Sequence, residues 1–153
     1  GRADIMDKVA PLGPVYQAGT LSGNPLAIAA GLTALRGLRS ENPYDRLEEL
    51  TARLERGIFE SGTRHGLKFQ LNRVGSMFTL FFIDQPVRDF EIGKTCDTDR
   101  FSEFHQAMLR KGIYWPPSQF ESAFVSTAHT EADIDYTIKV IEESFEEMIS
   151  TSI

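Results

Sequence analysis

Residues 13–25, with the sequence GPVYQAGTLSGNP, place small and hydroxyl-bearing side chains directly before the start of an expected helix. Gly19, Thr20 and Ser22 would supply flexible backbone, free amides and two hydroxyl groups there. Unpaired N–H groups and the helix dipole both favour an anion such as phosphate at a helix N-terminus. The alternative is that Ser22 and Asn24 only cap the helix. Spacing alone favours capping, because short glycine–hydroxyl patterns often match by chance.

A second candidate is the loop 116–121, with the sequence PPSQFE. Two adjacent prolines stiffen the loop and would hold Glu121 against Phe120 and Trp115. A carboxylate held in this way could transfer a proton or pair with a positive charge. A solvated surface glutamate would have the same sequence pattern, and spacing alone favours that interpretation.

The other reactive side chains do not indicate a further chemistry. His65, His105 and His129 are too far apart in sequence to predict a metal site, so no metal is expected. Cys96 stands in a polar segment without a nearby histidine, and we expect it to be incidental. No lysine has the apolar surroundings that would make its amine nucleophilic, so we expect none to form a Schiff base. The five lysines are Lys8, Lys68, Lys94, Lys111 and Lys139.

The helix after the first candidate site should begin at Asn24, whose side chain can accept a first-turn N–H. Pro25 would follow at the position where its missing N–H costs nothing. Residues 26–38 are apolar or small on almost every face, which predicts a buried helix. Residues 39–43 read as a linker, with Asn42 as the cap of the next helix.

Beyond residue 42 the apolar pattern alternates between helix and strand periods. Thr130 and Asp133 resemble a capping box, which would open the last helix. This order predicts an α+β fold, an antiparallel sheet with helices packed on one face. It also predicts two parts, residues 1–41 as the tail of a larger domain and residues 42–153 as a small α+β domain. The expected elements are a helix from 42 to about 62, strands 67–71 and 77–83, a loop 87–98, a helix 99–111, short strands 113–115 and 123–125, and a helix from 130.

Composition narrows the classes of function. Sixteen lysine and arginine residues against 22 aspartate and glutamate residues give a net charge of −6, without a basic run. Nucleic acid and acidic membrane surfaces are therefore poor partners. The single cysteine excludes an intramolecular disulfide and suits a reducing compartment, and no apolar run is long enough to span a membrane. The first residue is glycine rather than methionine, so we expect a piece of a longer chain.

Two long segments are similar to a known family. They are GRADIMDKVAPLGPVYQAGTLSGNPLAIAAGLTAL at the start and YWPPSQFESAFVSTAHTEADID near the end. Both resemble glutamate-1-semialdehyde 2,1-aminomutases, which are class III aminotransferases of the fold-type I pyridoxal-phosphate enzymes. The resemblance covers the whole chain and implies a C-terminal portion, with the end of the large cofactor domain followed by the complete small domain.

The resemblance implies specific roles for four residues. Thr20 would bind the phosphate of pyridoxal or pyridoxamine 5′-phosphate in the neighbouring subunit of a homodimer, with Gly19 allowing the close approach. Tyr16 would line that neighbour's pocket, and Glu121 would be the active-site carboxylate. The implied reaction converts glutamate 1-semialdehyde into 5-aminolevulinate for tetrapyrrole synthesis, in a bacterial cytoplasm or a plastid. The Schiff-base lysine would lie upstream, so this chain alone should be inactive.

Two alternatives stay open. Another class III aminotransferase would share the fold and Thr20 but would need a second substrate. A non-catalytic α+β dimerisation or interaction module would have the fold without the chemistry. The sequence also departs from the family at Ser122 and Ala123, where Ala-Gly is more usual, and this could alter the backbone after Glu121.

Overall fold

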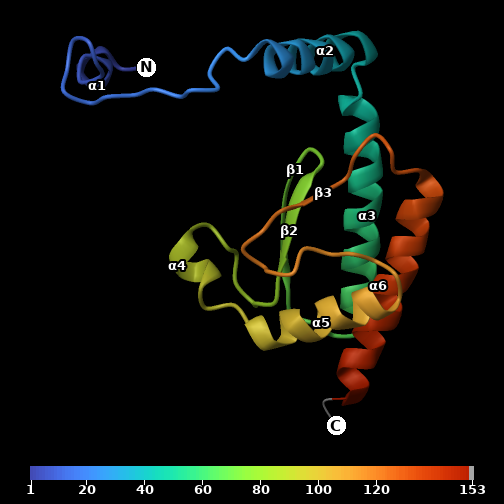
Figure 1. The fold of residues 1–153 in the computed structure, drawn as a ribbon. Coiled ribbons are helices and arrows are strands. Elements are labelled where there is room, and N and C mark those ends of the chain that lie inside the picture. Colours follow the sequence, from blue (N-terminus) through green and yellow to red (C-terminus); the bar gives the residue numbers. More distant parts are fainter. Residues whose placement is uncertain (152–153) are drawn as a thin grey trace. The chain divides into compact units, whose positions relative to one another are not determined.

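The computed structural model describes residues 1–151, which form two compact units divided between Asn42 and Pro43 (Figure 1). The first unit contains two helices, α1 (Ala3–Met6) and α2 (Pro25–Glu41). The second contains the other helices and all the described strands. These are α3 (Tyr44–Arg64), β1 (Gln70–Val74), β2 (Met77–Phe81), α4 (Phe90–Gly93), α5 (Thr98–Arg110), β3 (Ala123–Phe124) and α6 (Glu131–Thr151).

The start of α2 confirms the predicted cap. The Asn24 side chain accepts hydrogen bonds from the N–H groups of Leu26 at 3.0 Å and Ala27 at 3.2 Å, and Pro25 is the first helical residue. An Asn cap followed by proline satisfies two first-turn donors and removes a third, so local sequence alone places this end of the helix.

The end of α2 differs from the prediction. The helix continues through the expected linker to Glu41, and Asn42 then adopts a left-handed conformation with φ of 41°. The Asn42 N–H donates to the carbonyl of Leu38 at 3.1 Å. Asn42 therefore closes α2 instead of capping α3, because asparagine tolerates the left-handed conformation that ends many helices.

The prediction that α2 is buried is wrong for the described structure. No residue of α2 is buried, and its apolar side chains reach 80% exposure at Leu26 and 65% at Leu35. The other helix of its unit, α1, has only four residues and is too short to cover it. A run of apolar residues predicts that a helix can be buried, but burial also requires another part of the protein to cover the helix.

The sheet of the second unit has the order β1-β2-β3, with both pairs antiparallel. In β2 the side chains of Phe78 and Leu80 are buried, whereas Met77 and Thr79 on the opposite face are not. One covered face and one open face is the usual pattern of an antiparallel sheet, which confirms the α+β prediction. Residues 113–115 do not form the predicted strand.

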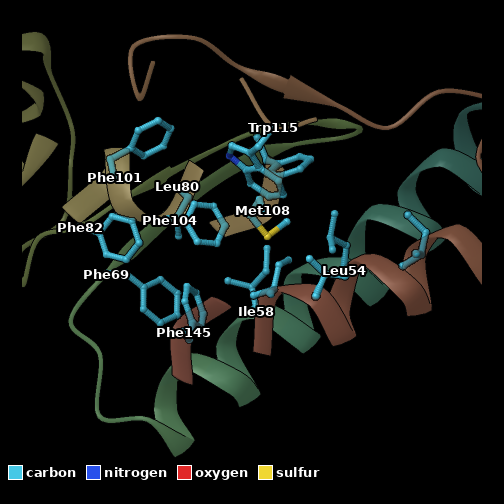
Figure 2. Close-up of a cluster of buried hydrophobic side chains, with 14 of the residues drawn as sticks. Leu54, Ile58, Phe69, Leu80, Phe82, Phe101, Phe104, Met108, Trp115 and Phe145 are labelled. Atoms are coloured by element: carbon cyan, nitrogen blue, oxygen red, sulfur yellow. The ribbon is translucent and has the colours of Figure 1, made fainter. Parts of the chain in front are cut away.

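Helices α3, α5 and α6 supply the other half of the core. Phe104 of α5 is fully buried at its centre, with ring centroids 5.4 Å from Trp115, 5.5 Å from Phe145 and 5.9 Å from Phe82 (Figure 2). Each buried ring removes a large apolar area from water, so this cluster stabilises the unit. The buried apolar residues of this core cluster are Leu50, Leu54, Ile58, Phe69, Phe78, Leu80, Phe82, Phe101, Phe104, Met108, Trp115, Val125, Ile134, Val140, Ile141, Phe145 and Met148.

Two smaller elements complete the unit. The predicted capping box is confirmed, since the Asp133 carboxylate accepts the Thr130 N–H at 2.7 Å and the Thr130 hydroxyl accepts the Asp133 N–H at 3.2 Å. Helix α4 lies inside the segment 87–98 that was expected to be irregular, and Asp89 caps it by accepting the Ile92 N–H at 2.9 Å. No helix among residues 1–151 is both long and apolar enough to cross a bilayer.

Candidate functional site

The turn before α2 is built from two overlapping reversals of the chain. The Ser22 N–H donates to the Gly19 carbonyl at 3.0 Å, and the Asn24 N–H donates to the Leu21 carbonyl at 3.1 Å. A Cβ atom on Gly19 would stand 2.6 Å from the Ser22 hydroxyl oxygen, so a larger residue would displace that side chain. Gly23 has φ of 74°, a left-handed conformation that glycine adopts without strain. Gly19 and Gly23 therefore allow the chain to form this tight turn.

The N-terminus of α2 has no free donor for an anion. Asn24 donates to Leu21, Pro25 has no N–H, and the N–H groups of Leu26 and Ala27 are taken by the Asn24 side chain. A phosphate could not use these groups without displacing the cap. An anion bound by this stretch would therefore take its donors from the residues before the cap.

Thr20 is different, because its donors are available. The residue is exposed, and within residues 1–151 neither its hydroxyl nor its N–H has a hydrogen-bond partner. Next to it, Gly19 has no side chain to block an approaching ligand. One hydroxyl and one amide are the kind of donors that a phosphate oxygen accepts.

Tyr16 belongs to the same unit and is 82% exposed. It follows Val15, whose N–H donates to the Lys8 carbonyl and whose carbonyl accepts from Ala10, each at 2.9 Å. These bonds hold the backbone just before Tyr16, while the Tyr16 residue itself is left mostly uncovered. Such an exposed aromatic ring is available to line a surface contributed by another part of the protein.

Glu121 lies in the second unit, at the end of a compact turn. Its N–H donates to the Ser118 carbonyl at 3.1 Å, and the Phe120 N–H donates to the Ser118 hydroxyl at 3.2 Å. The Glu121 carbonyl accepts from the Thr79 hydroxyl at 3.5 Å, and that hydroxyl lies 3.4 Å from the Ser122 hydroxyl. The backbone at Glu121 and Ser122 is thereby tied to the open face of β2.

The Glu121 carboxylate is exposed and makes no ion pair with any residue that the structure describes. It borders a shallow pocket of about 290 Å³ flanked by Tyr114 and Phe124, whose exposures are 78% and 63%. Trp115, which we expected beside Glu121, is instead buried in the core at 5% exposure. A charged group beside exposed aromatic rings is suited to binding a cationic or polar ligand group.

Sequence reasoning missed the contribution of α4 to this loop. The ring of Phe90 in α4 contacts the ring of Phe120 with centroids 6.0 Å apart, and the Gln119 side chain donates to the Gly93 carbonyl at 3.5 Å. A four-residue helix has too little periodicity to be recognised. The usable signal was Asp89 three residues before Ile92, the spacing of a side-chain cap.

The other reactive groups, the Cys96 thiol and four lysine amines, lie in surroundings that do not indicate a catalytic role. Cys96 is 6% exposed, and burial raises the pKa of its thiol, which keeps it protonated and unreactive. Four lysines among residues 1–151 form ion pairs with carboxylates. These pairs are Lys68–Asp84, Lys94–Glu91, Lys111–Glu147 and Lys139–Glu143. Within residues 1–151 no cluster of histidine, cysteine and acidic side chains could hold a metal ion.

Solved structures of pyridoxal-phosphate enzymes share this fold. An omega-transaminase from Sphaerobacter thermophilus matches 97% of this chain and 34% of its own chain, with a TM-score of 0.75 and 24% identity. The FumI protein of Sphingopyxis sp. MTA144, in a form that holds pyridoxal phosphate, matches 88% of this chain and 30% of its own, with a TM-score of 0.69 and 28% identity. No protein-family model matches the sequence. The fold is therefore that of a part of the pyridoxal-phosphate-dependent transaminases.

Sequence comparison narrows this class. A glutamate-1-semialdehyde 2,1-aminomutase of Thermus thermophilus is 56% identical over 146 residues, which cover 94% of this chain and 34% of that protein. Other curated relatives with the same name share 50–57% identity. The chain belongs to the glutamate-1-semialdehyde 2,1-aminomutases and corresponds to a C-terminal portion of them. It spans about a third of the length of the curated relatives it matches.

Proposed function

We propose that this chain is the C-terminal part of an enzyme that converts glutamate 1-semialdehyde into 5-aminolevulinate, a precursor of tetrapyrroles. The observation that carries the proposal is the identity of 50–57% with aminomutases over nearly the whole chain. When bound, pyridoxal or pyridoxamine phosphate supplies the chemistry that moves the amino group between adjacent carbons. The residues of this chain would bind and orient the reacting groups. The enzyme would act in a bacterial cytoplasm or a plastid.

Thr20 and Gly19 would hold the cofactor phosphate. Two free donors beside a residue without a side chain support this role, since a phosphate oxygen can accept from both the Thr20 hydroxyl and its N–H. We assign the phosphate to the neighbouring subunit of a homodimer, with Tyr16 lining the same pocket. The full exposure of this turn supports a ligand that another surface carries.

Glu121 would act from the second unit. Its carboxylate is free of ion pairs among the described residues and borders a pocket that exposed aromatic residues also line, so it can accept a hydrogen bond from an amino group or hold a proton near it. The turn at Ser118 and the contact with Thr79 hold its backbone in place. We assign it to orientation and charge balance during the exchange of amino groups.

The two units would belong to different domains of the whole enzyme. Residues 1–41 would be the end of the large cofactor-binding domain, and residues 42–153 the small C-terminal domain. The exposed apolar side chains of α2 support the first assignment, because such a helix gains stability only when another surface covers it. The relatives contain about twice as much further chain that could provide that surface.

The decisive experiment supplies the full-length protein with glutamate 1-semialdehyde and no keto acid. An aminomutase forms 5-aminolevulinate under these conditions, because it needs no second substrate. Turnover that begins only after a keto acid is added would assign the chain to a transaminase instead. A full-length protein that shows no activity and binds no cofactor would instead be a non-catalytic interaction module.

Thr20→Val in the full-length protein tests the phosphate site. It keeps the shape of the side chain but removes the hydroxyl, and we expect cofactor affinity to fall on the order of tenfold, as for one hydrogen bond to a charged group. Cofactor retained after gel filtration measures the effect. Thr33→Val is the matched control, because its hydroxyl bonds within α2 to the Ala29 carbonyl. Equal retention in both variants would contradict the role of Thr20.

A further inference from the structure

Gln119 is a buried polar residue in the loop that carries Glu121. Its side chain is 2% exposed although the loop lies at the surface. The amide nitrogen Nε2 donates to the Gly93 carbonyl at 3.5 Å, and the oxygen Oε1 has no partner among residues 1–151. A buried carbonyl without a partner destabilises a fold, so packing alone would favour an apolar side chain of similar length at this position. The glutamine therefore calls for a role other than stability.

The contacts of Gln119 and its neighbour Phe120 join the loop to α4. Gln119 reaches the last residue of this helix, Gly93, from inside the protein. Phe120, the next residue, is 54% exposed and contacts Phe90, the first residue of the helix, from outside. Gln119 and Phe120 thus contact the two ends of α4, and Glu121 is the next residue in the chain.

Helix α4 is itself attached to the sheet on both sides. Before the helix, the Asn72 side chain of β1 donates to the Val87 carbonyl at 2.8 Å. After it, the Asp97 N–H donates to the Phe82 carbonyl just beyond β2 at 3.0 Å. A loop that is anchored to α4 is therefore anchored to the sheet. This is the arrangement needed to hold one side chain in a fixed position at a surface.

We propose that Gln119 is a positioning residue for Glu121, and that its hydrogen bond to Gly93 fixes the loop in the geometry that the reaction requires. The inference rests on the role of Glu121 proposed above. It assigns to the amide of Gln119 a contribution to turnover and none to the stability of the fold. The two quantities should therefore separate when the amide is removed.

The first test is Gln119→Met in the full-length enzyme, which keeps the length of the side chain and removes both polar groups. We expect kcat to fall on the order of tenfold, as displacements of catalytic groups by less than 1 Å can do, while KM stays within about twofold and the midpoint of thermal unfolding does not fall. Gln106→Met is the matched control, since Gln106 is exposed on α5, and it should change none of the three. Wild-type kcat in Gln119→Met would overturn the proposal.

A double-mutant cycle with Glu121→Gln shows whether the effect passes through Glu121. We expect Gln119→Met to lower kcat in the wild-type background and to cause no further loss beside Glu121→Gln. The same fold-loss in both backgrounds would overturn the proposal. Full turnover of Glu121→Gln alone would refute the role of Glu121 and this inference with it. If Glu121→Gln lowers kcat but Gln119→Met does not, the role of Glu121 stands and only the inference about Gln119 is refuted.

Phe90→Ala provides a second route if Gln119→Met does not fold. The Phe90 ring is 66% exposed, so its removal leaves the core intact but releases the outer contact between α4 and Phe120. We expect a smaller fall in kcat, about threefold, that is again absent beside Glu121→Gln. A fall of equal size in both backgrounds, or no fall at all, would contradict the anchoring of Glu121 through α4.

Discussion

Helices α2 and α3 follow one another with two residues between them, yet they are stabilised in different ways. α2 has 17 residues and buries none, whereas α3 has 21 and buries seven. Local signals define α2, namely the Asn24 cap, Pro25 and a composition rich in alanine. In α3, Leu50, Leu54 and Ile58 form a stripe that packs into the core of the second unit. Helix formation and helix burial are thus separate properties of this sequence.

The largest expected effect comes from a core truncation. Phe104→Ala removes the ring at the centre of the aromatic cluster and should lower the free energy of unfolding of this chain by about 3–5 kcal/mol. Leu35→Ala in α2, where the side chain is 65% exposed, should change it by less than about 0.5 kcal/mol. Urea unfolding followed by tryptophan fluorescence reports on the second unit, because Trp115 contacts Phe104, and circular dichroism at 222 nm also follows α2.

The same pair of variants also tests the proposed division into domains. In the full-length protein, a covered α2 would make Leu35→Ala destabilising by about 2–5 kcal/mol, as for other buried leucines. A negligible effect there as well would show that α2 stays exposed in the whole protein. A large effect in the short chain would instead show that α2 is already packed, and the contrast between the two helices would disappear.

Two helical glycines give a smaller and opposite pair of effects. A Cβ atom on Gly57 of α3 would lie 2.6 Å from a side-chain carbon of Ile138 on α6, so Gly57→Ala should destabilise the second unit by about 1–3 kcal/mol. A Cβ atom on Gly31 of α2 would meet nothing within 4 Å, so Gly31→Ala should strengthen that helix by about 0.5–1 kcal/mol. Circular dichroism at 222 nm and urea unfolding separate these outcomes. Destabilisation by Gly31→Ala would contradict the open surroundings of α2.

The sequence predicted those parts of the fold that depend on local or periodic signals. The start of α2, strand β2 and the capping box at Thr130 were confirmed because each follows from residues close together in the chain. The exposure of α2 was missed because burial depends on which surfaces are present. Residues 113–115 alternate like a strand but pair with none, since strand formation requires a partner with free backbone groups.

Residue spacing predicted the candidate site less well than it predicted the fold. Spacing alone favoured capping for the turn near Thr20 and solvation for Glu121. Only the resemblance to aminomutases indicated functional roles for these two residues. The structure then showed that the donors of α2 are taken while those of Thr20 remain available. The burial of Gln119 could not be foreseen, because it depends on α4, an element too short to predict from the sequence.

The smallest effect we expect concerns how the two units respond to acid. Hydrogen bonds from the Thr130 hydroxyl and N–H, together with the charge of His129, hold the pKa of Asp133 below its usual value of 3.8. A folded-state pKa below the unfolded one stabilises the protein above about pH 4, and this stabilisation is lost as the pH falls through the folded value. Asn24, the cap of α2, does not titrate. Acid should therefore weaken the start of α6 but leave the start of α2 unchanged.

Asp133→Asn tests this difference, because it removes the charge but keeps the shape of the cap. We expect the variant to be less stable than wild type at neutral pH, with the difference shrinking as acid protonates Asp133 in the folded state. Urea midpoints measured from about pH 7 down to about pH 2.5 give both curves, with Glu103→Gln, an exposed residue of α5, as the control for loss of one negative charge. A constant difference between Asp133→Asn and wild type at all pH values would show that the cap acts through shape alone. A difference that closes as the pH falls would show that α6 begins with a titratable cap and α2 with a neutral one.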